Sequence, residues 1–189
     1  MFATASRVAY NPDVPGPLSK EAVEEAFRAL DAALPMEVTL IVGGGTAMTL
    51  AYGIPIATTD VDAYPAGISA AELDPYVKRV ARERGLAPDW LNTYYETFSF
   101  VLPRDYKSRL RDVFTGAHLR VRSLGLEDLL VMKCFAGRDK DRSHARALLR
   151  RKPDLSIVEG QLSALSEKGI KGAQNALDFF DDLLEEAMG

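Results

Sequence analysis

Apolar and polar residues follow two different periods along the chain, and the changes between these periods mark the expected elements. Apolar positions recur at helical spacing from Ser19 until Pro35 ends the run, which predicts a first helix. Residues 38–42 are a short apolar run rich in β-branched side chains, which predicts a buried strand. Residues 1–17 contain three prolines and no period, so we expect an irregular arm.

Helices and strands continue to alternate through the rest of the chain. Further helices are expected over residues 46–52, 69–84, 125–136, 139–151, 155–167 and 171–187. Further strands are expected over residues 56–64, 97–102 and 119–124, the first of them ended by Pro65 and Gly67. Glycine follows two of the helices, at Gly53 and Gly85, and Ser69 with Glu72 forms a capping-box signal.

This order predicts an α/β fold, in which a mixed β-sheet core flanked by helices is followed by a C-terminal helical tail. We expect the core over residues 18–124 and a helical region packed on it over residues 125–189. In strand 119–124, Leu119 and Val121 are expected to face the core while the arginines between them face outward. The last helix is amphipathic, with an expected buried face of Ala173, Leu177, Phe180, Leu184 and Ala187.

The composition limits the chemistry that the chain can support. A single cysteine, Cys134, excludes an internal disulfide, and its apolar neighbours predict an inert buried thiol. With only two histidines, any metal must be bound by oxygen rather than by Cys and His clusters. No apolar run approaches the ~20 residues that span a bilayer, and no signal-peptide pattern is present. These features predict a cytoplasmic protein without a membrane partner.

The net charge of −4 hides a strong asymmetry along the chain. Residues 104–152 hold 14 Lys or Arg residues against 6 Asp or Glu residues, a surplus of eight positive charges. Such a segment could attract a polyanion, either a nucleoside triphosphate (NTP) or RNA. Basic side chains also simply solvate helix surfaces, so the charge alone does not decide between these interpretations.

A glycine-rich turn and a pair of carboxylates carry the candidate chemistry. Residues 43–46 (Gly-Gly-Gly-Thr) join a predicted strand to a helix, where backbone N–H groups can bind phosphate oxygens. The turn lacks the spacing of a P-loop and of a dinucleotide-binding motif, and an unliganded tight turn is the simpler alternative. Asp60 and Asp62 are two residues apart, so on a strand they project from one face. Two such charges repel each other unless a cation intervenes, and Mg²⁺ (or Mn²⁺) beside a phosphate is the usual reason for the arrangement.

The conjunction of these motifs resembles the DNA polymerase β-like nucleotidyltransferase superfamily. The pattern of that superfamily is Gly-Gly, then a short helix, then Asp-hydrophobic-Asp. The sequences Gly44-Gly-Thr-Ala47 and Thr59-Asp-Val-Asp62 are most similar to the AbiEii-like toxins and their relatives. A second block, residues 129–141, resembles that family's Leu-x-x-x-Lys-x-x-Ala-x-Arg-x-x-Asp helix-turn-helix.

The resemblance implies roles for particular residues of both blocks. Asp60 and Asp62 would hold the metal, and Gly44, Gly45 and Thr46 would bind phosphate oxygens of an NTP. In the second block, Lys133 would contact the phosphates, Asp141 would lie near the same site, and Arg138 would assist in nucleotide binding. The sequence departs from the family at His144, where many relatives carry Asp. It also lacks an unambiguous third carboxylate, for which the candidates are Glu96, Asp105 and Asp112.

The implied activity is transfer of a nucleoside monophosphate (NMP) from an NTP to an acceptor hydroxyl. The toxin-like relatives modify RNA, chiefly tRNA, which would also imply a cognate antitoxin partner; protein or small-molecule acceptors are further possibilities. An inactive nucleotide-binding module is one alternative, because the third carboxylate is missing. A helical HEPN-like ribonuclease is another, supported only by the pair Arg138 and His144.

Overall fold

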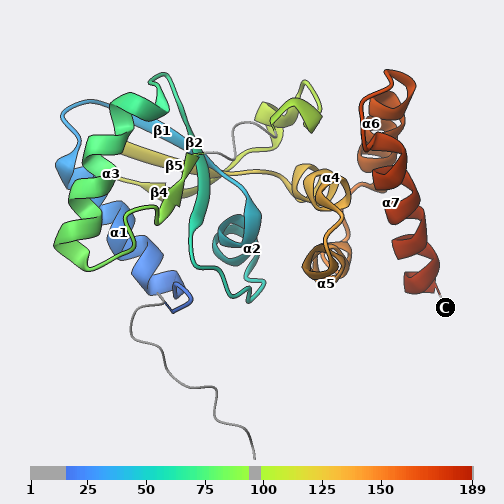
Figure 1. The fold of residues 1–189 in the computed structure, drawn as a ribbon, viewed down its shortest axis with the longest axis horizontal. Coiled ribbons are helices and arrows are strands. Elements are labelled where there is room, and N and C mark those ends of the chain that lie inside the picture. Colours follow the sequence, from blue (N-terminus) through green and yellow to red (C-terminus); the bar gives the residue numbers. More distant parts are fainter. Residues whose placement is uncertain (1–15, 94–98, 189) are drawn as a thin grey trace, which may run out of the picture.

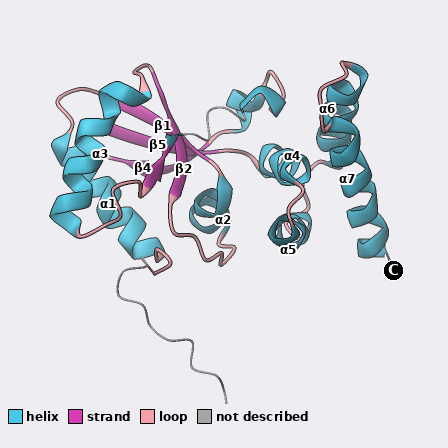
Figure 2. Ribbon diagram, in the orientation of Figure 1, coloured by secondary structure: helices cyan, strands magenta, loops and turns pink. Residues whose placement is uncertain are grey.

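The structure, a computed structural model, describes residues 16–93 and 99–188 as a mixed α/β fold (Figure 1). Its first half runs through α1 (Lys20–Ala33), β1 (Val38–Val42), α2 (Gly44–Tyr52), β2 (Val61–Ala66), α3 (Ala70–Arg84) and β3 (Leu91–Asn92). The second half comprises the 3₁₀ helix η2 (Tyr106–Arg109), β4 (Arg111–Thr115), β5 (Leu119–Ser123), α4 (Leu126–Ala136), α5 (Asp139–Leu149), α6 (Leu155–Glu167) and α7 (Ala173–Met188). Figure 2 shows the strands gathered in one half of the molecule and α4 to α7 in the other. The predicted fold class is therefore confirmed.

The sheet places the glycine turn at its centre. Its strand order is β3-β2-β1-β5-β4, with β1 antiparallel to β2 and parallel to β5. Val42, the last residue of β1, is paired with Ala63 on one side and Ser123 on the other. The turn that follows Val42 therefore emerges between the start of β2 and the end of β5.

The helix signals in the sequence act as expected. The Ser19 hydroxyl accepts a hydrogen bond from the Ala22 N–H (3.1 Å) and caps α1. Ser69 and Glu72 form a complete capping box at the start of α3. Gly53 and Gly85 adopt the left-handed conformation that ends α2 and α3. All the predicted helices are confirmed, with ends shifted by at most about two residues.

Two strand predictions need correction, and two strands were missed. The carboxylate strand was expected over residues 56–64, but β2 begins at Val61 and continues through Pro65 to Ala66. Pro65 is tolerated because β3 pairs only with Val61 and Asp62, which leaves β2 with one partner strand at Pro65. The strand expected over residues 97–102 is wrong for residues 99–101, which form a 3₁₀ turn, while residues 97 and 98 lie outside the described part. Strands β3 and β4 were not predicted.

The buried residues follow the predicted face in strand β5 and only part of the predicted face in helix α7. Leu119 and Val121 are buried while Arg120 is exposed, which confirms the predicted alternation in β5. Helix α7 was expected to bury Leu177, Leu184 and Ala187, but Leu177 and Leu184 are half-buried and Ala187 is exposed. Its buried face is Ala173 and Phe180, as predicted, together with Ala176 and Leu183. The difference arises because α7 packs against α4, α5 and α6 together.

The thiol of Cys134 and the polarity of the helices each test a prediction from the composition. Cys134 is buried, and burial raises the pKa of its thiol to about 12. The prediction that this thiol is buried is therefore confirmed. Across residues 16–93 and 99–188, the helices are all too short or too polar to cross a membrane.

Asp31 at the end of α1 holds the turn between β4 and β5. Its carboxylate accepts three backbone hydrogen bonds, from the N–H groups of Ala117 (3.1 Å), His118 (2.7 Å) and Leu119 (2.7 Å). Burial raises the pKa of Asp31, but the backbone hydrogen bonds outweigh it and the pKa is lowered overall. The ionised carboxylate therefore stabilises the fold at neutral pH.

We expect Asp31→Ala to lower the free energy of unfolding by about 2 kcal/mol at pH 7, because three donors lose a charged acceptor. The folded pKa of Asp31 lies below its unfolded value, so the difference from wild type shrinks as the pH falls through the folded pKa. Urea unfolding at pH 7 and pH 3 measures both effects. Asp74→Ala is the control, because Asp74 makes only an exposed ion pair with Lys78 and should change stability far less.

Candidate active site

The glycine turn is shaped by the carboxylate that lies against it. Gly44 adopts φ +58°, and a Cβ atom at this position would collide with Asp62 Oδ2. A Cβ atom at Gly45 would lie 2.8 Å from Ile56 Cγ2. Gly44 is therefore required for the close approach of α2 to the Asp62 carboxylate, and Gly45 for the close approach of α2 to the segment before β2.

Gly44→Ala is expected to lower the free energy of unfolding by more than the 1–2 kcal/mol or so that a left-handed alanine costs. The added methyl group must also displace the Asp62 carboxylate, so binding at the site should fall as well. Gly53→Ala is the matched control, because Gly53 has φ +60° and open space around the same position. Equal losses of stability in urea unfolding of the two variants would contradict the contact with Asp62.

Asp60 and Asp62 occupy different settings. Asp60 lies in the bend before β2, so the expectation that both residues sit on the strand is wrong for Asp60. Asp62 is half-buried on β2, and its Oδ1 atom accepts a hydrogen bond from Asn92 Nδ2 (3.1 Å). Burial raises the pKa of Asp62, and the neighbouring charge of Asp60 raises it further, whereas Lys133 acts in the opposite direction.

The Thr46 side chain holds the backbone at Asp60 in place. It is buried, and its hydroxyl donates to the backbone carbonyl of Asp60 (3.2 Å), which also accepts from the Thr58 hydroxyl (2.9 Å). These bonds replace the strand pairing that Asp60 lacks. The structure thus gives Thr46 a positioning contact with the segment that carries Asp60.

The second block forms a compact cluster of charges around Asp141. Asp141 is fully buried, and its carboxylate accepts hydrogen bonds from Lys133 Nζ (2.9 Å) and Arg138 Nε (2.6 Å). Burial raises the pKa of Asp141, but the bonds from Arg138 and Lys133 outweigh it and the pKa is lowered overall. His144 Nδ1 lies 4.0 Å from the same carboxylate, and burial lowers the His144 pKa, which favours the neutral imidazole.

A pocket of about 460 Å³ joins the two blocks. Its polar lining consists of Gly44, Asp62, Asn92, Lys133 and Arg138. Its apolar lining consists of Val101, Leu129, Met132, Phe135 and Ala136. Residues separated by about ninety positions in the sequence therefore face one cavity. Gly45, Thr46, Asp60 and Asp141 are not part of this lining, but Asp141 bonds to both lining cations and Asp60 lies close enough to Asp62 to raise its pKa. Asn92 is a lining residue that the sequence analysis missed, because β3 is too short to leave a pattern.

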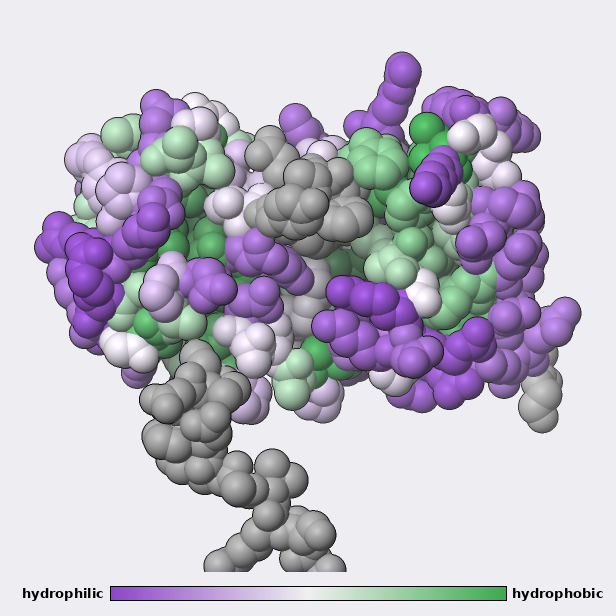
Figure 3. Space-filling view, in the orientation of Figure 1, coloured by the Kyte–Doolittle hydropathy of each residue, from purple (hydrophilic) through white to green (hydrophobic). Residues whose placement is uncertain are grey.

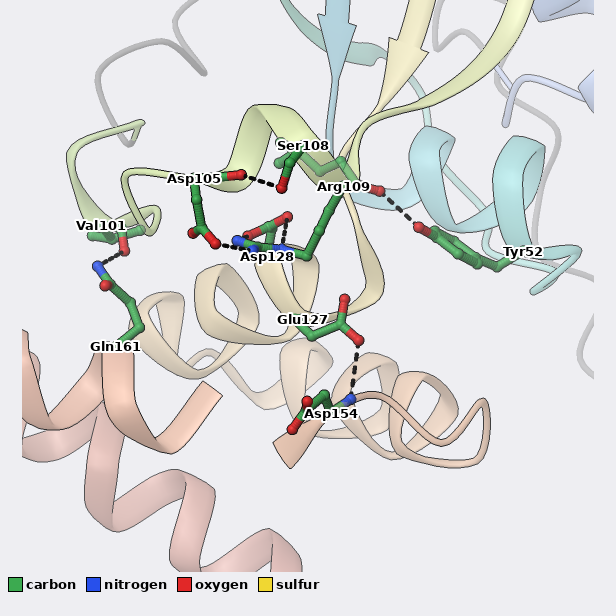
Figure 4. A network of polar contacts seen from close by, with 10 residues as sticks. Tyr52, Val101, Asp105, Ser108, Arg109, Glu127, Asp128, Asp154 and Gln161 are labelled. Carbon is green, nitrogen blue, oxygen red and sulfur yellow. Dashed lines mark hydrogen bonds and ion pairs between the residues drawn. The ribbon is translucent and has the colours of Figure 1, made fainter. Parts of the chain in front are cut away.

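Neither of the described candidates for a third carboxylate, Asp105 and Asp112, lines the pocket. Glu96 lies outside the described residues. Asp105 pairs with Arg109 (2.8 Å), which also holds the buried Asp128 (2.7 Å), so this candidate belongs to a structural network (Figure 4). Asp112 pairs with Arg120 (2.7 Å) on the edge of the sheet. Within the described residues, no three Asp, Glu, His or Cys side chains are grouped so as to hold a metal ion.

The fold and the pocket define an α/β protein in which a glycine turn, the Asp62 carboxylate and two cationic side chains line one cavity, with the Asp60 charge close to Asp62. Residues 21–171 match the family described as "Nucleotidyltransferase of unknown function (DUF6036)", and the chain therefore belongs to this family. No curated protein and no solved structure matches the chain. The resemblance to nucleotidyltransferases is thus confirmed at the level of the family, whereas the closer likeness to AbiEii-like toxins stays a prediction.

Proposed function

We propose that the protein transfers an NMP group from an NTP to an acceptor hydroxyl in a Mg²⁺-dependent reaction. The observation that carries this proposal is the shared pocket of Gly44 and Asp62 with Lys133 and Arg138. The glycine turn and the cations suit a triphosphate, and the carboxylates suit its metal ion. Membership in a nucleotidyltransferase family supports the same reaction.

Asp62 in the pocket lining, with Asp60 close to it, fits a divalent cation. Asp62 ionises against the effects of burial and of the Asp60 charge, so a bound cation would relieve an unfavourable arrangement. Carboxylate oxygens are the ligands that Mg²⁺ prefers, and in this proposal Asp60 and Asp62 hold it. When bound, Mg²⁺ supplies positive charge against the triphosphate.

The other pocket residues then orient the NTP for in-line attack. The N–H groups at the start of α2 and the cations of Lys133 and Arg138 bind phosphate oxygens. The acceptor oxygen forms a bond to the α-phosphorus, the bond between that phosphorus and the oxygen that bridges it to the β-phosphorus breaks, and the hydroxyl proton passes to solvent water. Pyrophosphate leaves, and Lys133 offsets the charge that develops on it.

RNA, chiefly tRNA, is the proposed acceptor, with a role as the toxin of a toxin–antitoxin pair. The basic segment of residues 104–152 supports an RNA acceptor, since Arg104, Lys107 and Lys140 are exposed on it. Electrostatic binding of RNA predicts an affinity that falls steeply with salt concentration, unlike that of a small uncharged acceptor. A toxin role further predicts slower growth on expression without a cognate antitoxin.

A nucleotide-binding module without catalysis is the second candidate function. It is favoured by one observation: among the described residues, Asp62 is the one carboxylate that lines the pocket, and no three acidic, His or Cys side chains are grouped to hold a metal ion. The HEPN-like ribonuclease is not favoured, because the five-stranded sheet differs from that all-helical fold.

Incubation of the protein with each α-³²P-labelled NTP, Mg²⁺ and total tRNA tests the proposal. A labelled RNA band that is lost in Asp60→Asn supports transfer and identifies both the nucleotide and the acceptor. Intact, unlabelled RNA together with measurable NTP binding would favour the binding module. Shortened RNA would instead favour the ribonuclease hypothesis.

A further inference from the structure

The pocket has an apolar side that the proposed triphosphate contacts do not use. Helix α4 contributes Leu129, Met132, Lys133, Phe135 and Ala136 to the lining. At about 100° per residue, Lys133 and Phe135 lie at opposite borders of this lining face, about 160° apart, with the other three between them. The polarity of the wall therefore changes across a single helix, from a cation to an aromatic ring.

Contacts beyond α4 extend the apolar side. Phe100 and Phe135 meet edge to face, with ring centroids 5.7 Å apart, and Phe100 is 55% exposed. Val101 lines the pocket next to Phe100 in the chain, and its carbonyl accepts a hydrogen bond from Gln161 Nε2 of α6 (2.7 Å; Figure 4). This bond fixes the segment that carries both side chains. Figure 3 shows apolar surface on the helical half of the molecule, bordered by hydrophilic side chains.

We propose that this apolar side binds the nucleobase of the NTP through its flat face, without reading its hydrogen-bonding edge. The inference rests on the proposed function, which places the triphosphate at Lys133 and Arg138. Aromatic and aliphatic side chains hold any base by stacking and packing, because every base has a π-face. The five apolar lining side chains of the described residues carry no N–H or O–H donor and no oxygen acceptor.

Weak selection between the two purines follows from this lining. A pocket that hydrogen-bonds its substrate rejects a mismatched group strongly, whereas an apolar pocket discriminates weakly between ligands of similar shape. Adenine and guanine have nearly the same shape and different edges. Purines also bury more surface than pyrimidines, so they should bind more tightly.

Isothermal titration of the wild-type protein in Mg²⁺ with ATP, GTP, CTP, UTP and inorganic tripolyphosphate tests this specificity. We expect ATP and GTP to bind within about tenfold of each other, both more tightly than CTP, UTP and tripolyphosphate. A larger preference for one purine, tighter binding of a pyrimidine, or tripolyphosphate binding as tightly as ATP would overturn the inference. The last of these results leaves the proposed function standing, whereas no binding of any probe would remove both.

Ala136→Trp locates the base within the pocket. Ala136 is exposed in the last turn of α4, so an indole there should be accommodated without loss of the fold while filling the apolar side. We expect ATP to bind at least about tenfold more weakly, with tripolyphosphate binding unchanged. The matched control is Ala71→Trp on the exposed side of α3, which should leave both affinities unchanged. Unchanged ATP binding in Ala136→Trp would overturn the inference.

Discussion

The Asp62→Asn variant is expected to lose nucleotide transfer by about 10³-fold while its free energy of unfolding stays equal or rises. Burial and the Asp60 charge both raise the pKa of Asp62, so its folded pKa lies above its unfolded value. The ionised carboxylate therefore opposes folding at neutral pH, and a neutral amide removes this cost. The Asn oxygen can still accept the hydrogen bond from Asn92.

Transfer assays and urea unfolding at pH 7 and pH 3 measure the two effects. Any gain in stability should disappear as the pH falls below the unfolded pKa, because wild-type Asp62 is then protonated in both states. Asp74→Asn on the exposed side of α3 is the control and should leave transfer unchanged. Wild-type turnover in Asp62→Asn would remove this residue from the proposed mechanism.

The sequence predicted most of the fold because many of its signals are local. Ser19, Gly53 and the Ser69–Glu72 capping box act within a few residues of their own positions, and they end or begin helices as expected. The short strands gave no such signal. Leu91–Asn92 is too brief to show a period, and Arg111–Thr115 is a strand only because it pairs with β5.

Helix α7 shows why a buried face can be misassigned. Apolar residues come in pairs along it, as in Ala176-Leu177, Phe179-Phe180 and Leu183-Leu184. Either member of each pair continues a helical period, so the sequence permits two faces that differ by about 100°. Packing against α4, α5 and α6 selects Ala176, Phe180 and Leu183.

The site was predictable to the extent that its motifs are contiguous. Gly44 and Asp62 were recognisable from their motifs, and Lys133 and Arg138 only from the resemblance of residues 129–141 to a family motif; the structure brings all four to one pocket. Their partners were not, because Asn92 reaches Asp62 only through the pairing of β2 with β3. The positioning contact of Thr46 likewise depends on where the fold brings the Asp60 carbonyl.

Asp141→Ala is expected to cause the largest loss of stability, about 3–5 kcal/mol at neutral pH. Asp141 is fully buried, and its partner Lys133 is only 7% exposed, so the variant leaves an ammonium group buried without its bonded carboxylate. Arg138 also loses the acceptor that orients it. Because the pKa of Asp141 is lowered in the folded state, wild type itself should lose this contribution as the pH falls through the folded pKa.

A double variant shows whether the loss of stability in Asp141→Ala comes from the unpaired charge of Lys133 or from lost packing. Lys133→Met with Asp141→Leu removes both charges and fills the space, so it should recover much of the stability that Asp141→Ala loses. The same double variant should not recover nucleotide binding, because Lys133 is absent from the pocket. Urea unfolding and titration with tripolyphosphate measure the two properties. A loss below about 1 kcal/mol in Asp141→Ala would show that Lys133 reaches water or another anion when Asp141 is gone, and that Asp141 does not hold it in the pocket.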